Sequence, residues 1–218
     1  MSVISRRTTR PLRFGVVAPI TRDVATWRDQ LRRLADSGYS TILMPDVPQW
    51  QPAPGPALAV AATITGPRVG TWVYASPVRP AWSTAWEAHS LSLLTNGRFE
   101  MGIGTGRPGI AEQLRELGLP IDSASQRSDH VRDVVTALRQ LDGADRHTPV
   151  AMAVAGPDID TAAVRAADSL AYLPDDPAAA AAAEEIQRRR EELGFSYFVF
   201  GADVSDALAP VVADLAGR

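Results

Sequence analysis

Short apolar segments typical of strands alternate with helix-like segments along the chain. The strand-like segments are rich in Val, Ile, Phe and Tyr, whereas in the helix-like segments apolar residues recur at helical spacing. We predict strands at 12–18, 40–46, 68–76, 98–104, 149–155 and 196–200, with a further one at 170–173. Helices are predicted within 22–39, 57–65, 80–95, around 131–141, and at 160–169, 178–193 and 205–217. Such alternation is typical of parallel strands with helices packed outside them.

The length of the chain narrows this α/β class further. A complete eight-fold (β/α) barrel usually takes about 250 residues, and the sequence has 218. We therefore expect a single TIM-barrel domain at 12–218 that is shortened or incomplete, with fewer than eight regular units and a partly opened ring. A doubly wound sheet is the alternative. The basic segment 1–11 is expected to be a disordered N-terminal arm.

Composition excludes several classes of partner and chemistry. The net charge of −3 predicts no general attraction to nucleic acid or to an anionic membrane. The sequence has no cysteine, so disulfides, thiolate metal sites and cysteine nucleophiles are excluded together. Arg6 and Arg7 form a pair typical of an export signal, but the apolar run after them is short. We expect a cytoplasmic protein with neither a nucleic-acid nor a membrane partner.

Gly104, Gly106 and Gly109 spell G-x-G-x-x-G, the pattern of a dinucleotide-binding loop. In that fold the glycines follow the first strand, and an acidic residue ends the next strand about 20 residues later. Here they follow the fourth strand, and the next one begins only near Pro149. No Lys-Ser or Lys-Thr pair follows Gly109, so a Walker loop is excluded as well. The dinucleotide-fold interpretation therefore fails.

In a barrel the same glycines have another use. The loops after the strands form the active site, and glycines there allow the backbone to approach a flat ligand closely. The alternative is purely structural: Gly102 and Gly104 relieve crowding inside the barrel, while Gly106 and Gly109 make a turn. The sequence leaves both interpretations open.

Other barrel chemistries find little support. A glycosidase needs two carboxylates at strand ends, and only Asp46 stands in such a position. His89, His130 and His147 have no metal-ligand spacing, so we predict no metal site. Trp86 is expected to pack in the core.

Several blocks of sequence, in this order and at these separations, are similar to one known family. They are "GYSTILMPD" (38–46), "RVGTWVYAS" (68–76), "LLTNGRFEMGIGTG" (93–106), "VAMAVAG" (150–156), "RRREELGFSYFVF" (188–200) and "DALAPVVADLAG" (206–217). Over roughly 11–172 and 184–217 the chain resembles the bacterial luciferase-like oxidoreductases. The resemblance is greatest to the branch that uses the deazaflavin coenzyme F-420.

The resemblance implies a flavin or deazaflavin bound across the carboxyl ends of the strands, with coenzyme F-420 or FMN as the cofactor. It also implies a non-prolyl cis peptide near Ala75–Ser76, behind the ring. Asp46 and Arg107 are the catalytic candidates. The implied cofactor-binding residues are Asp46, Ala75, Ser76, Gly104, Thr105, Gly106, Ala155 and Gly156.

Departures from the family pattern leave two functions open. Val47 stands where the branch commonly has a histidine, Asp158 and Asp160 stand where a coenzyme phosphate is usually bound, and a stretch after 174 is largely absent. The first hypothesis is an oxidoreductase, working by hydride transfer or monooxygenation on a small-molecule substrate. The alternative is a degenerate member without catalysis or cofactor, acting as a binding or partner subunit. A homodimer, or pairing with a longer relative, is expected in either case.

Overall fold

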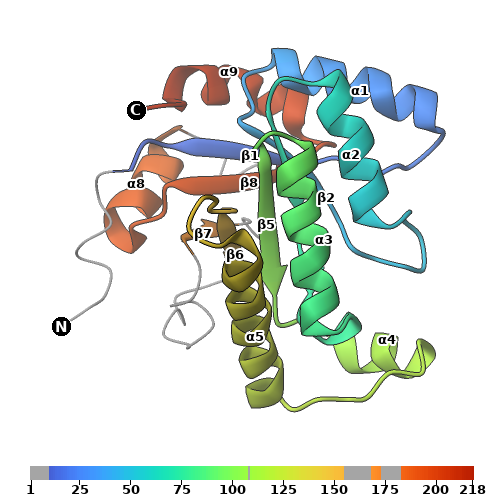
Figure 1. The fold of residues 1–218 in the computed structure, drawn as a ribbon. Helices are drawn as coiled ribbons and strands as arrows, with labels where there is room; N and C mark the ends of the chain where they lie inside the picture. Colours follow the sequence, from blue (N-terminus) through green and yellow to red (C-terminus); the bar gives the residue numbers. More distant parts are fainter. Residues whose placement is uncertain (1–9, 108, 155–167, 173–182) are drawn as a thin grey trace.

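The computed structural model describes residues 10–107, 109–154, 168–172 and 183–218, in which strands and helices alternate (Figure 1). In chain order the elements are β1 (Arg13–Val17), α1 (Val24–Asp36), β2 (Thr41–Met44), α2 (Pro54–Ile64), β3 (Arg68–Thr71), β4 (Tyr74–Ala75), the 3-10 turn η2 (Ser76–Val78), α3 (Ala81–Leu94), β5 (Phe99–Gly104), α4 (Ile110–Glu116), α5 (Ala124–Asp142), β6 (Val150–Val154), β7 (Ser169–Tyr172), α8 (Ala183–Leu193), β8 (Tyr197–Gly201) and α9 (Ser205–Leu215).

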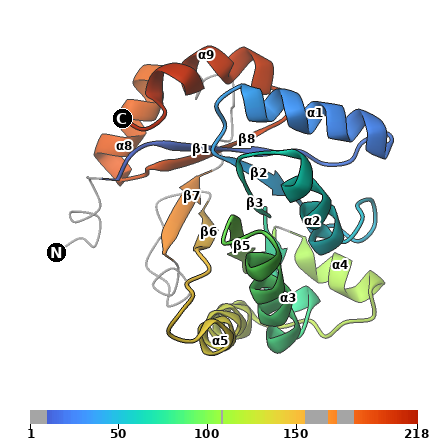
Figure 2. The same cartoon turned by 45° about the horizontal axis from the view of Figure 1, so that its top comes forward.

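All the strands belong to one parallel sheet, in the order β3-β2-β1-β8-β7-β6-β5-β4. β3 also pairs with β5, with Val69 opposite Phe99 and Gly70 opposite Glu100. This pairing joins the first strand of the order to the seventh, so the sheet closes into a barrel with helices outside it (Figure 2). The prediction of a shortened (β/α) barrel is confirmed, and the expected gap in the ring is not found between the described strands.

All seven predicted strands form, but one of them is divided into two shorter strands. The segment predicted as a single strand at 68–76 is two strands, β3 and β4, separated by a cis peptide between Trp72 and Val73. The cis peptide expected near Ala75–Ser76 was therefore predicted at the wrong position. Most of the helix predicted at 160–169, the start of the one at 178–193 and residues 1–9 of the predicted arm lie outside the described residues.

The strands bury both of their faces. One face packs against the helices and contains most of the core, for example Phe14 and Val16 of β1. The other face points to the barrel axis, because side chains alternate along a strand. Its apolar residues form a separate small cluster of Leu43, Ala151, Tyr197 and Val199, with Val17 and Trp72 packed against it.

Polar side chains fill the barrel interior at the amino ends of the strands. Arg13 donates to the buried carboxylate of Glu100 at 2.6 Å, and its guanidinium lies 4.2 Å from the ring centre of Tyr197. Burial, followed by the negative charge of Glu100, raises the pKa of Tyr197 well above its ordinary value. These side chains occupy the interior at this end, whereas ligands of barrel enzymes bind at the carboxyl ends of the strands.

The helices pack through faces of different character. The buried face of α3 consists of small or slender side chains, including Ala85, Ala88 and Leu91, which allow the helix to lie close to its neighbours. Trp86 projects from the opposite face and is 55% exposed, so the expectation that it packs in the core is wrong.

No helix in the described ranges is both long enough and apolar enough to cross a bilayer.

The closure of the ring predicts a severe effect for Gly102→Ala. A Cβ at this position would lie 1.9 Å from the carbonyl oxygen of Thr71, and both atoms are fixed by the sheet. We expect the free energy of unfolding to fall by about 3 kcal/mol, measured by urea denaturation. Gly66→Ala is the control, because a Cβ there meets no atom within 4 Å. Equal effects of the two substitutions would contradict the close approach of β3 and β5.

Candidate functional site

The carboxyl ends of β2, β4 and β5 bring several of the predicted residues to one rim of the barrel. Ala75 of β4 is the register partner of Gly104 of β5, and Asp46 follows β2 by two residues. Thr105 and Gly106 are partly exposed after β5, and Arg107 is exposed beside them. Of the remaining predicted residues, Ala155 and Gly156 lie outside the described residues.

Asp46 is buried and engaged on both carboxylate oxygens. Arg79 donates to it from Nη2 at 2.7 Å and from Nε at 3.2 Å, in the bidentate geometry that makes arginine–carboxylate pairs strong. Burial alone lowers the pKa of Arg79, but the hydrogen bond and charge of Asp46 outweigh burial, so the pKa of Arg79 is raised. The pair ties the chain after β2 to the segment after η2.

Glu87 of α3 extends this network. It accepts from Arg79 at 3.2 Å and from the hydroxyl of Tyr74 at 2.7 Å. Burial, followed by the charge of Glu87, raises the pKa of Tyr74 well above its ordinary value. Gly55 of α2 provides the room, because a Cβ there would lie 2.5 Å from a carboxylate oxygen of Glu87. The network thus lies where the rim meets α2 and α3, and its polar groups bind one another.

The hydroxyl of Ser76 is directed at α5. Ser76 is buried and donates to the carbonyl oxygen of Arg127 at 3.2 Å. Arg127 in turn donates from Nε to the carbonyl oxygen of Thr105 at 2.8 Å. Three residues further along α5, His130 donates from Nε2 to the carbonyl oxygen of Arg79 at 2.9 Å. The first turns of α5 therefore contact the ends of both β4 and β5.

The glycines of the G-x-G-x-x-G pattern have local structural reasons. A Cβ on Gly104 would lie 3.0 Å from Cγ2 of Val73, so the predicted relief of crowding is confirmed. Gly106 and Gly109 have positive φ angles of 96° and 84°, which confirms the predicted turn. The close-approach interpretation is compatible with these roles, since Gly104 and Gly106 on either side of Thr105 have no side chains.

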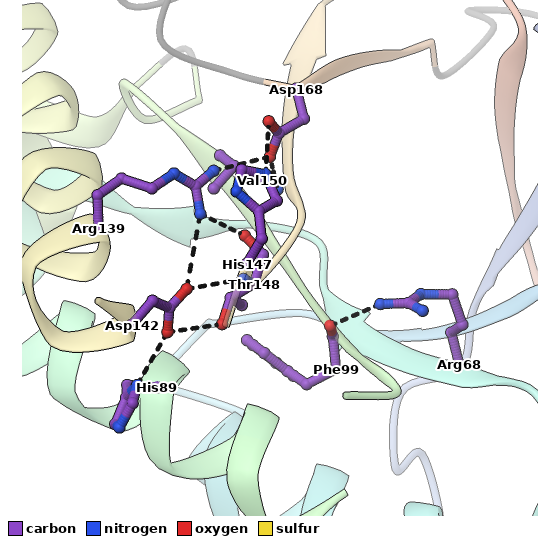
Figure 3. Close-up of polar contacts among 9 residues, drawn as sticks. All are labelled: Arg68, His89, Phe99, Arg139, Asp142, His147, Thr148, Val150 and Asp168. Carbon is purple, nitrogen blue, oxygen red and sulfur yellow. Dashed lines mark hydrogen bonds and ion pairs between the residues drawn. The ribbon is translucent and has the colours of Figure 1, made fainter. Parts of the chain in front are cut away.

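A second cluster of titratable groups lies near the amino end of β6 (Figure 3). Asp142 ends α5 with a fully buried carboxylate, which accepts from His89 at 2.8 Å and from the Thr148 backbone at 2.7 Å. Burial alone raises the pKa of Asp142, but the hydrogen bonds from His89 and Thr148 outweigh burial and lower it. The cluster thus joins α3 and α5 to the start of β6. In a barrel this end of the strands serves stability rather than catalysis.

Asp168 continues the second cluster toward β7. Its carboxylate accepts from Arg139 and from the Val150 backbone, each at 2.8 Å, and from His147 at 2.9 Å. Figure 3 shows these contacts, and beside them the separate hydrogen bond from Arg68 to the carbonyl oxygen of Phe99. Within the described ranges, no three His, Asp or Glu side chains are grouped so that they could hold a metal ion.

Sequence reasoning predicted part of this rim and missed its supporting contacts. Tyr74, Glu87, Arg127 and His130 were not assigned to the site, although all four contact predicted site residues or their neighbours. One signal was available for Arg127. Ser123 and Gln126 form a capping box that starts α5, and a helix that follows β5 must start near the carboxyl rim.

No protein-family model matches the chain, and no curated protein matches its sequence. Among solved structures, the coenzyme F-420-dependent tetrahydromethanopterin reductase of Methanopyrus kandleri superimposes with a TM-score of 0.63 at 17% identity, over 88% of this chain and 65% of that one. An F-420-dependent secondary alcohol dehydrogenase, in complex with an F-420–acetone adduct, gives 0.64 at 15% identity, over 88% and 68%.

The third comparison is a type II Baeyer–Villiger monooxygenase component from Pseudomonas putida, in complex with FMN. It gives a TM-score of 0.55 at 14% identity, over 85% of this chain and 64% of that one. The chain thus spans about two thirds of the length of these enzymes. At such identities the likeness shows a shared fold, that of the TIM barrels to which these oxidoreductases belong.

The pKa of Asp142 predicts a pH-dependent contribution to stability. Because the pKa is lowered on folding, the carboxylate stabilises the native state above the unfolded pKa of about 4. That contribution is lost as the pH falls through the lower folded value. The difference in unfolding free energy between the wild type and Asp142→Asn should therefore shrink as the pH is lowered below about 4.

The control for this measurement is Asp129→Asn, which removes an exposed partner of Arg132 on the same helix. It should change the free energy of unfolding by less than about 1 kcal/mol at any pH. Chemical denaturation at pH 3 to 7 gives both curves. A wild-type to Asp142→Asn difference that stays constant with pH would contradict the assignment.

Proposed function

We propose that the protein is an oxidoreductase that binds the deazaflavin coenzyme F-420 or FMN at the carboxyl rim and acts on a small-molecule substrate. One observation carries this proposal. Gly104 is the register partner of Ala75 at the strand ends, and Gly106 turns the chain just beyond it, in a fold shared with enzymes described as F-420-dependent or as FMN complexes. Ligands of barrel enzymes bind at this face.

The residues of the rim fit such a cofactor. Its flat ring needs an apolar wall that it can approach closely, and Ala75, Gly104 and Gly106 present only small side chains or none. A reduced deazaflavin supplies a hydride, while reduced FMN supplies a hydride or activates oxygen. The chain itself would bind and orient the ring and exclude water from one of its faces.

The polar and charged residues of the rim have two different roles in this proposal. Asp46 and Ser76 act by holding the rim in place, because their side chains are occupied by Arg79 and Arg127. Arg107 is exposed after the turn at Gly106 and is the cation proposed to bind an anionic tail or an acidic substrate. Ala155 and Gly156 remain predicted contacts of the ring.

The alternative is a binding or partner subunit without catalysis. One observation favours it: Arg79 binds both Asp46 and Glu87, and Tyr74 donates to Glu87, so that these three side chains present no free acid or base. An oxidoreductase of this kind needs few such groups, because the cofactor carries the chemistry. We therefore favour the oxidoreductase. A measurement of cofactor binding distinguishes it from the non-catalytic subunit.

We further propose that two copies of this chain associate through α3. Trp82, Trp86 and Leu93 project from one side of this helix at helical spacing, with Leu94 beside them, and all are exposed. The two tryptophan rings lie 5.2 Å apart. An apolar stripe of this kind is typical of an interface, and a two-fold axis beside α3 would pair it with the same stripe of the second copy.

The proposed function predicts quenching or enhancement of ring fluorescence on titration with FMN and with the deazaflavin coenzyme. Gly104→Val should weaken binding about tenfold or more, since its side chain would crowd Val73 and displace the strand end that is proposed to line the ring. Gly66→Val, in an exposed loop, is the control. Circular dichroism verifies that both variants are folded. If neither cofactor binds the wild type at high micromolar concentration, the oxidoreductase proposal is overturned.

The proposed assembly predicts a dimer in light scattering and sedimentation. Trp86→Glu should shift it to monomer without loss of folding, because the side chain is largely exposed in one copy. Val24→Glu places the same charge on an exposed apolar position of α1 and should leave the dimer intact. A monodisperse wild-type monomer at high concentration would rule out self-association through α3.

A further inference from the structure

Arg127 stands out among the residues that no prediction had assigned, because it contacts three separate segments of the rim. Its Nε donates to the carbonyl oxygen of Thr105, and its Nη1 donates to the carbonyl oxygen of Asp122, each at 2.8 Å. Its own carbonyl oxygen accepts from the hydroxyl of Ser76. A single residue thus joins the end of β5, the loop before α5 and the end of β4.

The two bonds made by the side chain suit the geometry of arginine, whereas the bond from Ser76 is accepted by the backbone of Arg127. The guanidinium is planar and rigid, so bonds from Nε and Nη1 fix both of the carbonyls they reach in direction as well as in distance. Hydrogen bonds from a charged donor are also stronger than neutral ones. The side chain is partly buried, which protects the bonds from competing water. Arg127 therefore holds Thr105 in one orientation.

The orientation of Thr105 determines that of the peptide beyond it. In a trans peptide the C=O and N–H groups point in opposite directions. When Arg127 holds the carbonyl of Thr105 toward α5, the N–H of Gly106 is turned away from α5. Gly106 itself has a φ of 96°, a conformation that a glycine leaves easily unless something holds it.

We propose that Arg127 is a positioning residue for the ring, which fixes the backbone of 104–106 and the end of β4 as one platform. This inference rests on the proposed function, because the platform is defined by the ring it would carry. Arg127 acts through Thr105 and Ser76 and does not itself touch the ring. Arg107, by contrast, is proposed to bind the anionic tail. Substitution of Arg127 should therefore weaken binding of the ring, and substitution of Arg107 should weaken binding of the tail.

The test compares riboflavin, which has the ring without the phosphate, with FMN. Arg127→Met should weaken the binding of both to the same extent, by about tenfold, since a charged hydrogen bond to the platform is lost. Arg127→Lys should recover part of the affinity, because an ammonium group keeps the charge and the donors but lacks the rigid planar arrangement that fixes both carbonyls. Arg107→Met should weaken the binding of FMN and leave the binding of riboflavin unchanged.

Arg132→Met is the matched control on the same helix, since Arg132 pairs only with Asp129 among the contacts described. Hydrogen exchange of the ligand-free protein gives a second measurement. Arg127→Met should raise the exchange of amides in 104–110, and the control should not. Wild-type affinity for riboflavin and FMN in folded Arg127→Met, or unchanged exchange, would overturn this inference alone. A wild type that binds no ring would instead overturn the proposed function.

Discussion

The structure depends on the close approach of two backbones at Gly102. There the carbonyl oxygen of Thr71 occupies the space that any side chain on β5 would need, and the hydroxyl of Thr71 donates to the carbonyl of Gly102 at 2.7 Å. This contact brings β3 against β5 and closes the ring in a chain that spans about two thirds of the length of the barrel enzymes compared with it. The closed ring in turn sets the strand ends side by side, where the candidate site lies.

The two ends of the barrel are held by different contacts. At the amino end, Arg13, Glu100 and Tyr197 lie together in the interior, while Asp142 and Asp168 join the helices to the sheet outside it. At the carboxyl end, Arg79 binds Asp46, and Arg127 holds the backbone at Thr105. A rim of this kind supplies shape and rigidity, which is what an enzyme needs when its cofactor carries the reaction.

The sequence predicted the strands well because each is marked by local residue types, and it predicted the barrel because alternation and resemblance agree. The structural role of Gly102 and Gly106 was one of two interpretations that the sequence left open, and the structure supports it. Trp86 was misplaced because its helical face could not be assigned without knowing what α3 packs against. Arg127 and Glu87 were missed because their partners lie far away in sequence, at Thr105 and Tyr74, and only the closed ring brings them together.

The central claim is that a flavin-type ring lies against the backbone of 104–106 at the carboxyl rim. A crystal structure of the chain soaked with FMN or with the deazaflavin coenzyme tests it most directly. The account predicts a ring stacked beside Ala75 and Gly104, with its anionic tail toward Arg107. A ring bound at another face of the barrel, or a rim that stays empty at saturating cofactor, would contradict it.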